Sequence, residues 1–92
     1  MNRKRIKAVF SGTVQGVGFR VNTENIARQY PVCGYVRNTP GGYVEVVAEG
    51  DEANLRGFIQ AIKESSLSSY IRNVKSEWLD AKEEFSDFKI VH

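Results

Sequence analysis

One glycine-rich segment of the chain combines residue types that could bind a negatively charged group. Residues 12–20 contain Gly12, Gly16 and Gly18 and end at Arg20, between a strand-like pattern and a helical one. The first backbone N–H groups of a helix have no partner within it and lie at the positive end of its dipole, so they can bind phosphate. The guanidinium of Arg20 would add a planar fork of donors that matches phosphate oxygens. The segment therefore predicts a phosphate site in front of a helix.

Two well-known phosphate-loop patterns do not fit this segment. The Walker pattern needs Gly-Lys followed by Ser or Thr after four residues, but Val17 is the fifth residue after Gly12 and no lysine follows. In the dinucleotide fingerprint, Gly16 and Gly18 match the first two glycines, but Val21 stands where the third belongs. Spacing alone therefore leaves two equal alternatives, a phosphate cradle or a crossover loop that binds nothing.

The numbers of cysteine and histidine residues exclude much of catalytic chemistry. The chain has one cysteine, Cys33, which cannot form an internal disulfide, and one histidine, His92, which we expect to fray at the last position. No Cys or His pair has metal-ligand spacing, and clustered carboxylates such as those within 80–87 are usually solvated. We therefore expect no metal site and no histidine-dependent triad. Cys33 is expected to be a small strand residue, and an unpaired cysteine agrees with a reducing, cytoplasmic location.

Length and charge indicate the class of protein. With 92 residues, of which 41% are hydrophobic, we expect one domain over 1–92 with its own core. Four cations lie among the first seven residues, whereas residues 8–92 carry nine Lys and Arg against eleven Asp and Glu. Such a basic arm is expected to keep an N-terminal strand soluble rather than to bind nucleic acid. We find no signal-peptide core or spanning segment, and we expect a cytoplasmic monomer that binds neither membrane nor nucleic acid.

The elements that must position the glycine-rich segment follow from apolar periodicity and turn residues. Alternation with period two indicates strands, and apolar residues at i, i+3, i+4 and i+7 indicate helices. The expected elements are strand 6–12, a helix ending at Tyr30 before Pro31, strands 32–36 and 44–48 joined by turn 38–42, a helix capped by Asp51, strand 71–79, and a short strand 88–91.

This order predicts the fold class. A β-α-β-β-α-β order with a short extra C-terminal strand is typical of the α+β, ferredoxin-like two-layer sandwich, in which two helices cover one face of an antiparallel sheet. The other face would be left to solvent. We expect strand 44–48 to place Val44, Val46 and Ala48 under the helices and to turn Glu45 and Glu49 toward water.

Three blocks of the sequence closely resemble the acylphosphatase family. They are Gly12-x-Val14-Gln15-Gly16-Val17-Gly18-Phe19-Arg20, then Gly34-Tyr35-Val36-Arg37-Asn38, then Gly42-x-Val44-Glu45-Val46-x-x-Glu49-Gly50. The resemblance covers nearly the whole chain, from the first strand to Val91. It implies a small ferredoxin-like enzyme that hydrolyses the carboxyl-phosphate bond of acyl phosphates without metal or cofactor. By the same resemblance, Arg20 and Asn38 are catalytic. The phosphate cradle is formed by the loop amides of Gln15, Gly16, Val17, Gly18 and Phe19, continuing to Arg20.

The sequence departs from the family pattern outside the cradle. Val21 stands where an aromatic residue often follows the arginine, and Tyr30-Pro31 replaces a leucine-glycine exit from the first helix. Gly41 replaces a turn Asp or Asn, and the serine-rich stretch 65–69 replaces a glycine- and proline-rich loop. We expect these changes to affect contacts to the acyl group, loop positions and stability rather than the phosphate chemistry.

An acyl phosphate suits a site with so few side chains. Its leaving carboxylate has a conjugate acid with a pKa of about 4 to 5, so the departing oxygen needs no general acid. Asn38 carries an amide that both donates and accepts, which suits holding a water in line with the scissile bond. Without the resemblance, the favoured interpretation of Asn38 is a turn starter before residues 39–41.

Two other functions are compatible with the expected fold. RNA-recognition domains share its element order and bind through the open sheet face, but this chain would present Tyr43, Glu45 and Glu49 there, and carboxylates repel a phosphate backbone. Acylphosphatase-like domains also occur within hydrogenase-maturation carbamoyltransferases, although we see no further domain in this sequence. A non-catalytic phosphate- or nucleic-acid-binding module is therefore the alternative to an enzyme that acts on a small acyl phosphate.

Overall fold

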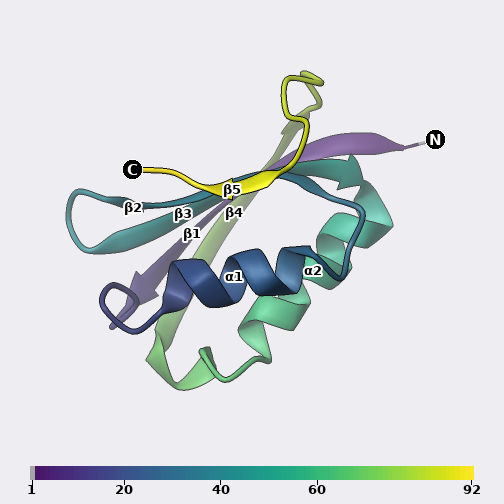
Figure 1. Ribbon diagram of the computed structural model, residues 1–92. Helices are drawn as coiled ribbons and strands as arrows, with labels where there is room; N and C mark the ends of the chain where they lie inside the picture. Colours follow the sequence, from purple (N-terminus) through teal and green to yellow (C-terminus); the bar gives the residue numbers. More distant parts are fainter. Residues whose placement is uncertain (1) are drawn as a thin grey trace.

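A computed structural model describes residues 2–92, which form a five-stranded sheet with both helices on one face (Figure 1). Neither helix is long and apolar enough to cross a membrane. The predicted α+β, ferredoxin-like fold is confirmed. The elements are β1 Arg3–Gly12, α1 Phe19–Ala27, β2 Cys33–Thr39, β3 Tyr43–Asp51, α2 Glu52–Lys63, β4 Ile71–Asp80 and β5 Phe88–Ile90, with a single 3-10 turn at Ser68–Tyr70 before β4.

The sheet is mixed, which corrects the prediction of a wholly antiparallel one. Its strand order is β4-β1-β3-β2-β5, and the first four strands pair antiparallel. β5 pairs parallel with β2, with Gly34 opposite Phe88 and Val36 opposite Ile90. The directions of the strands explain this parallel pairing. β4 runs opposite to β1, and the chain reverses once in residues 81–87, so β5 must run in the direction that β1 and β2 share.

The core lies between the sheet and the helices, as the periodicity predicts. Val44, Val46 and Ala48 of β3 are fully buried beneath the helices. The apolar face of α2 is equally buried, and it consists of Leu55, Phe58, Ile59 and Ile62. Asp51 occupies the N-cap position of α2 as expected, but its side chain makes no capping hydrogen bond.

The chain itself covers one end of the opposite face of the sheet, and the expectation for its two glutamates is wrong. Glu49 is completely buried and Glu45 is only 6% exposed. The segment 81–87 folds back against this face, and the N–H groups of Lys82 and Glu83 donate to the Glu49 carboxylate at 2.8 and 3.0 Å. Glu45 accepts hydrogen bonds from the Arg37 guanidinium and from the Tyr35 hydroxyl. These carboxylates are therefore satisfied by the protein and do not face water.

Arg5 completes this arrangement, which we call the Glu49 network: Arg5, Glu49, Glu84 and the backbone N–H groups of Lys82 and Glu83. Arg5 Nε donates to Glu49 at 2.8 Å, its other end pairs with Glu84, and its guanidinium lies 5.0 Å from the centre of the Phe85 ring. Burial by itself raises the pKa of the Glu49 carboxyl, but the donors around it outweigh that effect and hold the pKa below its usual value.

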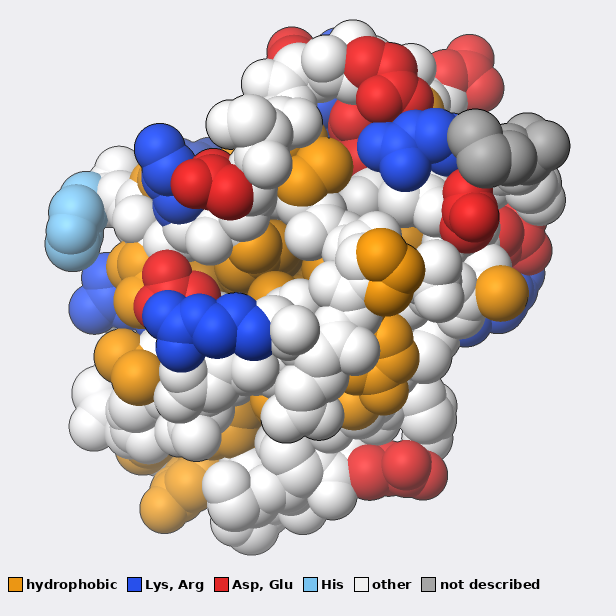
Figure 2. Space-filling model, turned by 45° about the vertical axis from the view of Figure 1, so that its right-hand side comes forward, with side chains coloured by type: hydrophobic (Ala, Val, Ile, Leu, Met, Phe, Trp, Pro, Cys, Tyr) orange, Lys and Arg blue, Asp and Glu red, His pale blue; other side chains and the backbone are white. Residues whose placement is uncertain are grey.

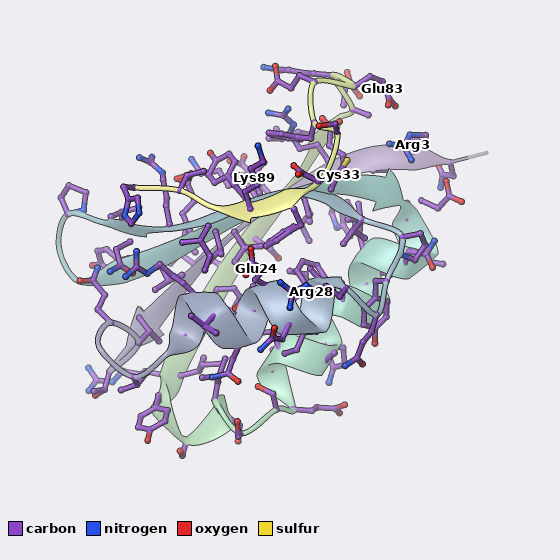
Figure 3. All side chains as sticks on the ribbon, viewed as in Figure 1. Arg3, Glu24, Arg28, Cys33, Glu83 and Lys89 are labelled. Carbon is purple, nitrogen blue, oxygen red and sulfur yellow. The ribbon has the colours of Figure 1, made fainter. Side chains whose placement is uncertain are left out.

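Exposed ion pairs surround the Glu49 network. Arg3 and Glu83 pair at 2.7 Å beside Cys33 on the side of the sheet away from α1 (Figure 3). Red and blue side chains are interleaved over this end of the surface (Figure 2). Burial raises the pKa of the Cys33 thiol, which disfavours the reactive thiolate. The segment 81–87 and these pairs cover the Arg5 and Glu49 end of the face through which an RNA-recognition domain would bind.

Candidate active site

The topology brings the glycine-rich loop and the β2–β3 hairpin to one end of the sheet (Figure 1). Phe10, near the end of β1, lies opposite Val44 at the start of β3, and Val44 lies opposite Asn38 near the end of β2. The loop that leaves β1 therefore starts at the same level of the sheet as Asn38. Because β1 and β2 are separated only by β3, residues far apart in the sequence meet at this end.

A cavity of about 440 Å³ lies between the loop, the start of α1 and the edge of the sheet. A larger hollow of about 600 Å³ lies elsewhere, beside Gly12, Tyr43, Arg72 and Lys75, but contains neither Arg20 nor Asn38. We take the smaller cavity as the candidate active site because it joins both predicted catalytic side chains. Its lining residues are Val14, Gly16, Gly18, Phe19, Arg20, Val21, Asn38, Ile90 and His92.

Two glycines give the loop its shape. Gly16 has φ of 81° and Gly18 has φ of 78°, both in the left-handed region that side chains with a Cβ rarely adopt. A Cβ added to Gly16 would meet no atom within 4 Å, so the backbone angle, and not crowding, requires glycine there. Gly18 is the N-cap of α1, where no side chain caps the helix and no acidic residue lies in the first turn. The first N–H groups of α1 are therefore free to donate toward the cavity.

Arg20 stands in the first turn of α1 without a counter-charge. Among residues 2–92, no carboxylate lies within ion-pair distance of its guanidinium, whereas Arg5 and Arg37 are both paired. A cation near a helix N-terminus is disfavoured by roughly 0.3 to 1 kcal/mol. An anion bound in the cavity would offset this cost and would meet both the guanidinium and the helix amides.

Asn38 is a strand residue, not the turn residue that its type alone favours. It is the penultimate residue of β2 and lies on the same face as Val36, toward the helices. Its Oδ1 atom is buried and has no hydrogen-bond partner among the described residues. An unsatisfied buried acceptor costs about 1 to 3 kcal/mol. The cavity that Asn38 lines could supply a donor to this atom.

Only some of the other predicted site residues line the cavity. Gly16, Gly18 and Phe19 line the cavity, but Gln15 and Val17 do not. The Phe19 ring is buried and packs on Phe10 with 5.1 Å between ring centres, so only its backbone is available to a ligand. The Gln15 side chain is turned toward the β2–β3 hairpin.

Val14 of the glycine-rich motif also lines the cavity, and three lining residues outside that motif were not predicted as site residues: Val21, Ile90 and His92. Val21 follows Arg20 on α1 and is 56% exposed. β5 brings the other two, because its parallel pairing with β2 carries the chain past Val36 toward Asn38. The structure thus places His92 in the cavity wall, although we expected it to fray. No local pattern encodes a parallel register between strands 50 residues apart.

No group of three or more His, Cys, Asp or Glu residues that could hold a metal ion occurs within 2–92. The polar groups that line the cavity include an unpaired guanidinium, an amide oxygen without a partner, the backbone N–H groups of a glycine loop and the imidazole of His92. Such groups can bind an anion, neutralise its charge and orient a small polar molecule beside it.

Comparisons with known proteins identify relatives over the whole chain. The acylphosphatase family model matches residues 6–90. An acylphosphatase of Marinobacter nauticus is 38% identical over 92 residues and covers 100% of both chains. An acylphosphatase of Lactobacillus johnsonii is 39% identical over 90 residues, covering 97% of this chain and 99% of its own.

Solved structures give the same result. A crystal structure of acylphosphatase from Bacillus subtilis superimposes with a TM-score of 0.89 at 32% identity, covering 97% of this chain and 99% of that one. Full-length HypF in its phosphate- and nucleotide-bound form matches with a TM-score of 0.85 at 33% identity, and the match covers 99% of this chain but 12% of HypF.

Proposed function

Because the chain belongs to the acylphosphatase family, we propose that Arg20 and the amides of loop 15–20 hold the phosphoryl group of an acyl phosphate while Asn38 positions the attacking water. The chain is an acylphosphatase, which converts an acyl phosphate into a carboxylate and inorganic phosphate. The geometry of the cavity supports this division of work among the residues.

The phosphoryl group fits the positively polarised side of the cavity. Arg20 has no protein partner, and the helix start beside it has neither a side-chain cap nor an acidic residue. A bound phosphoryl group would accept hydrogen bonds from the guanidinium and from the amides around Gly16 and Gly18. In a loose phosphoryl-transfer transition state, charge lies on the three equatorial oxygens, and these donors would stabilise it.

The unpartnered Oδ1 of Asn38 is the observation that carries the assignment of the water. A water in the cavity could donate one O–H to this oxygen and direct a lone pair at phosphorus. The water oxygen then forms the new P–O bond while the bond to the acyl oxygen breaks and its electron pair leaves with the carboxylate. The proton of the water passes to a phosphoryl oxygen of the substrate itself.

The substrate class follows from what the cavity does not need to supply. A carboxylate leaves without protonation, whereas an alkoxide leaving group would require an acid. A guanidinium is a poor proton donor, so Arg20 does not supply that acid, and we assign no proton transfer to His92, which follows the edge strand β5. Acyl phosphates should therefore be hydrolysed, and alkyl phosphomonoesters should not.

Phosphate release tests this proposal directly. The protein is incubated with acetyl phosphate or benzoyl phosphate and, in parallel, with glycerol phosphate, with and without EDTA. We expect rapid release from both acyl phosphates, background release from glycerol phosphate and no effect of the chelator. Equal turnover of the ester, or loss of activity in EDTA that added metal restores, would refute the mechanism.

A further inference from the structure

The side chain of Gln15 forms a bridge that its predicted role did not include. Its Nε2 donates to the carbonyl oxygen of Thr39 at 3.0 Å and to the carbonyl oxygen of Tyr43 at 2.8 Å. Thr39 and Tyr43 are opposite residues that close the β2–β3 hairpin. One carboxamide thus uses both of its N–H bonds on the two strands of the hairpin.

This bridge joins the two halves of the proposed site. Gln15 belongs to the loop whose amides face the phosphoryl group, and Thr39 directly follows Asn38. Within residues 2–92, these are the hydrogen bonds that connect loop 13–18 with the hairpin. The Thr13 N–H donates instead to the Tyr70 carbonyl at 2.9 Å, just before β4, and the Gly18 carbonyl accepts from Asn22 of α1. The Gln15 side chain therefore couples the loop to the end of the strand that carries Asn38.

We infer that Gln15 is a positioning residue that sets the distance between the phosphate cradle and Asn38. This inference rests on the proposed function, in which Arg20 and Asn38 act on the same phosphorus from different elements. In-line attack requires the water to stay aligned with the scissile bond, and a displacement of about 1 Å can cost about 10²-fold in rate. The Gln15 side chain is bonded to the hairpin and does not line the cavity, so this side chain acts through the hairpin rather than on the substrate.

The chemistry of the bridge specifies glutamine. Two carbonyl oxygens are both acceptors, so the side chain between them must offer two donors and no charge. Methionine has a similar length but no donor. A glutamate carboxylate would place acceptors against acceptors, whereas a protonated carboxyl group regains one O–H donor. The pH dependence of a glutamate variant therefore reports on the bridge itself.

Kinetics of two variants test the inference. For Gln15→Met we expect kcat for benzoyl phosphate to fall about 10- to 100-fold, while the inhibition constant of inorganic phosphate changes less than about twofold because Arg20 and the amides remain. For Gln15→Glu we expect low activity at pH 7 and recovery relative to wild type as the pH falls toward about 4.5, where the carboxyl group protonates.

Thr39→Val is the matched control. It removes a weaker 3.4 Å hydroxyl contact to the same Tyr43 carbonyl but leaves the Gln15 bridge in place, so kcat should stay within about twofold of wild type. Circular dichroism and thermal unfolding of each variant separate a displaced site from an unfolded protein, and the pH ratio for Gln15→Glu keeps the test decisive if Gln15→Met does not fold.

Different failures have different meanings. If wild type hydrolyses acyl phosphates but Gln15→Met keeps its kcat, or Gln15→Glu follows the wild-type pH profile, the inference is wrong and the proposed function stands. If phosphate inhibition weakens as much as kcat falls, Gln15 belongs to the anion site and does not act as a positioning residue. If wild type itself releases no phosphate from acyl phosphates, the proposed function fails, and this inference fails with it.

Discussion

The Glu49 network and the candidate active site lie in the same sheet and treat an arginine in opposite ways. In the network, Glu49 accepts three hydrogen bonds, and Arg5 pairs with two carboxylates and stacks on Phe85. In the cavity, Arg20 has no partner among the described residues, and the buried Asn38 Oδ1 has none either. Polar groups that the protein itself satisfies hold its segments together, whereas polar groups that it leaves unsatisfied are available to a ligand.

The comparison separates two energetic roles. Breaking a buried ion pair leaves a charge without compensation and typically costs 3 to 5 kcal/mol. Removing an unsatisfied polar group or an unfavourably placed cation costs the folded state little and can stabilise it. Substitutions in the network should therefore lower the free energy of unfolding and leave kcat nearly unchanged. Substitutions in the cavity should lower kcat and leave the free energy of unfolding nearly unchanged.

Arg20→Ala should show the largest effect. We expect kcat/KM for an acyl phosphate to fall by about 10³-fold or more, roughly 4 kcal/mol, with weaker inhibition by inorganic phosphate. The temperature of unfolding should stay unchanged or rise slightly, because a cation leaves a helix N-terminus. Arg20→Lys should remain far below wild type, since an ammonium lacks the planar fork. A large loss of stability in Arg20→Ala would show that this arginine, like Arg5, stabilises the fold.

Glu49→Ala tests the other side of the comparison. It leaves Arg5 and two backbone N–H groups without their acceptor, so we expect the free energy of unfolding to fall by about 3 kcal/mol. The value of kcat per folded molecule should stay near wild type. Glu83→Gln, which changes the exposed pair with Arg3, is the control and should cost less than about 1 kcal/mol. Denaturant titration measures both, and equal losses would show that burial of Glu49 is unimportant.

Asn38→Ala should lower kcat by roughly 10²-fold, about 2.7 kcal/mol, because the water loses its acceptor. Inhibition by inorganic phosphate should remain within about twofold of wild type, in contrast to Arg20→Ala. Stability should not fall, because the variant removes a buried oxygen that has no partner. If the inhibition constant of phosphate rose as much as kcat fell, Asn38 would belong to the anion site, and another group would have to position the water.

The smallest effect concerns acid stability. The pKa of Glu49 lies below its usual value in the folded protein, so its contribution to stability is present above the unfolded pKa of about 4.3 and is lost as the pH falls through the folded pKa. The free energy of unfolding should therefore decline below about pH 4.3. Glu49→Gln should show a shallower decline over the same range, and identical slopes for the two proteins would contradict the assignment.

The parts of this molecule that a sequence can predict are those with local causes. The buried face of α2 and the inward residues of β3 follow from periodicity, and the glycine-rich loop before Arg20 follows from the conformations that glycine permits. The role proposed for Asn38 rests on the family resemblance, because its type alone favours a turn. The resemblance also named Gln15, but only for its backbone amide.

Features that depend on long-range contacts could not be predicted in this way. Glu49 alternates in phase with solvent-facing positions, yet segment 81–87 covers it with two N–H groups. That segment has no periodic pattern, so its position could not be predicted from the sequence. The parallel pairing of β5, and with it the position of His92 in the cavity, likewise depends on a register that only the folded sheet defines.

The short strand β5 gives the cavity two walls of different local stability. Arg20 and Asn38 lie on α1 and on β2, an interior strand of the sheet, whereas Ile90 and His92 come from a three-residue edge strand and the residues after it, paired with β2 alone. Short edge elements open in fluctuations that leave the rest of a protein folded. Amide hydrogens of residues 88–91 should therefore exchange with solvent before those of β2. Each such opening would detach the outer wall of the cavity and leave the wall with Arg20 and Asn38 in place, so the entrance would widen without moving the groups proposed to act on phosphorus.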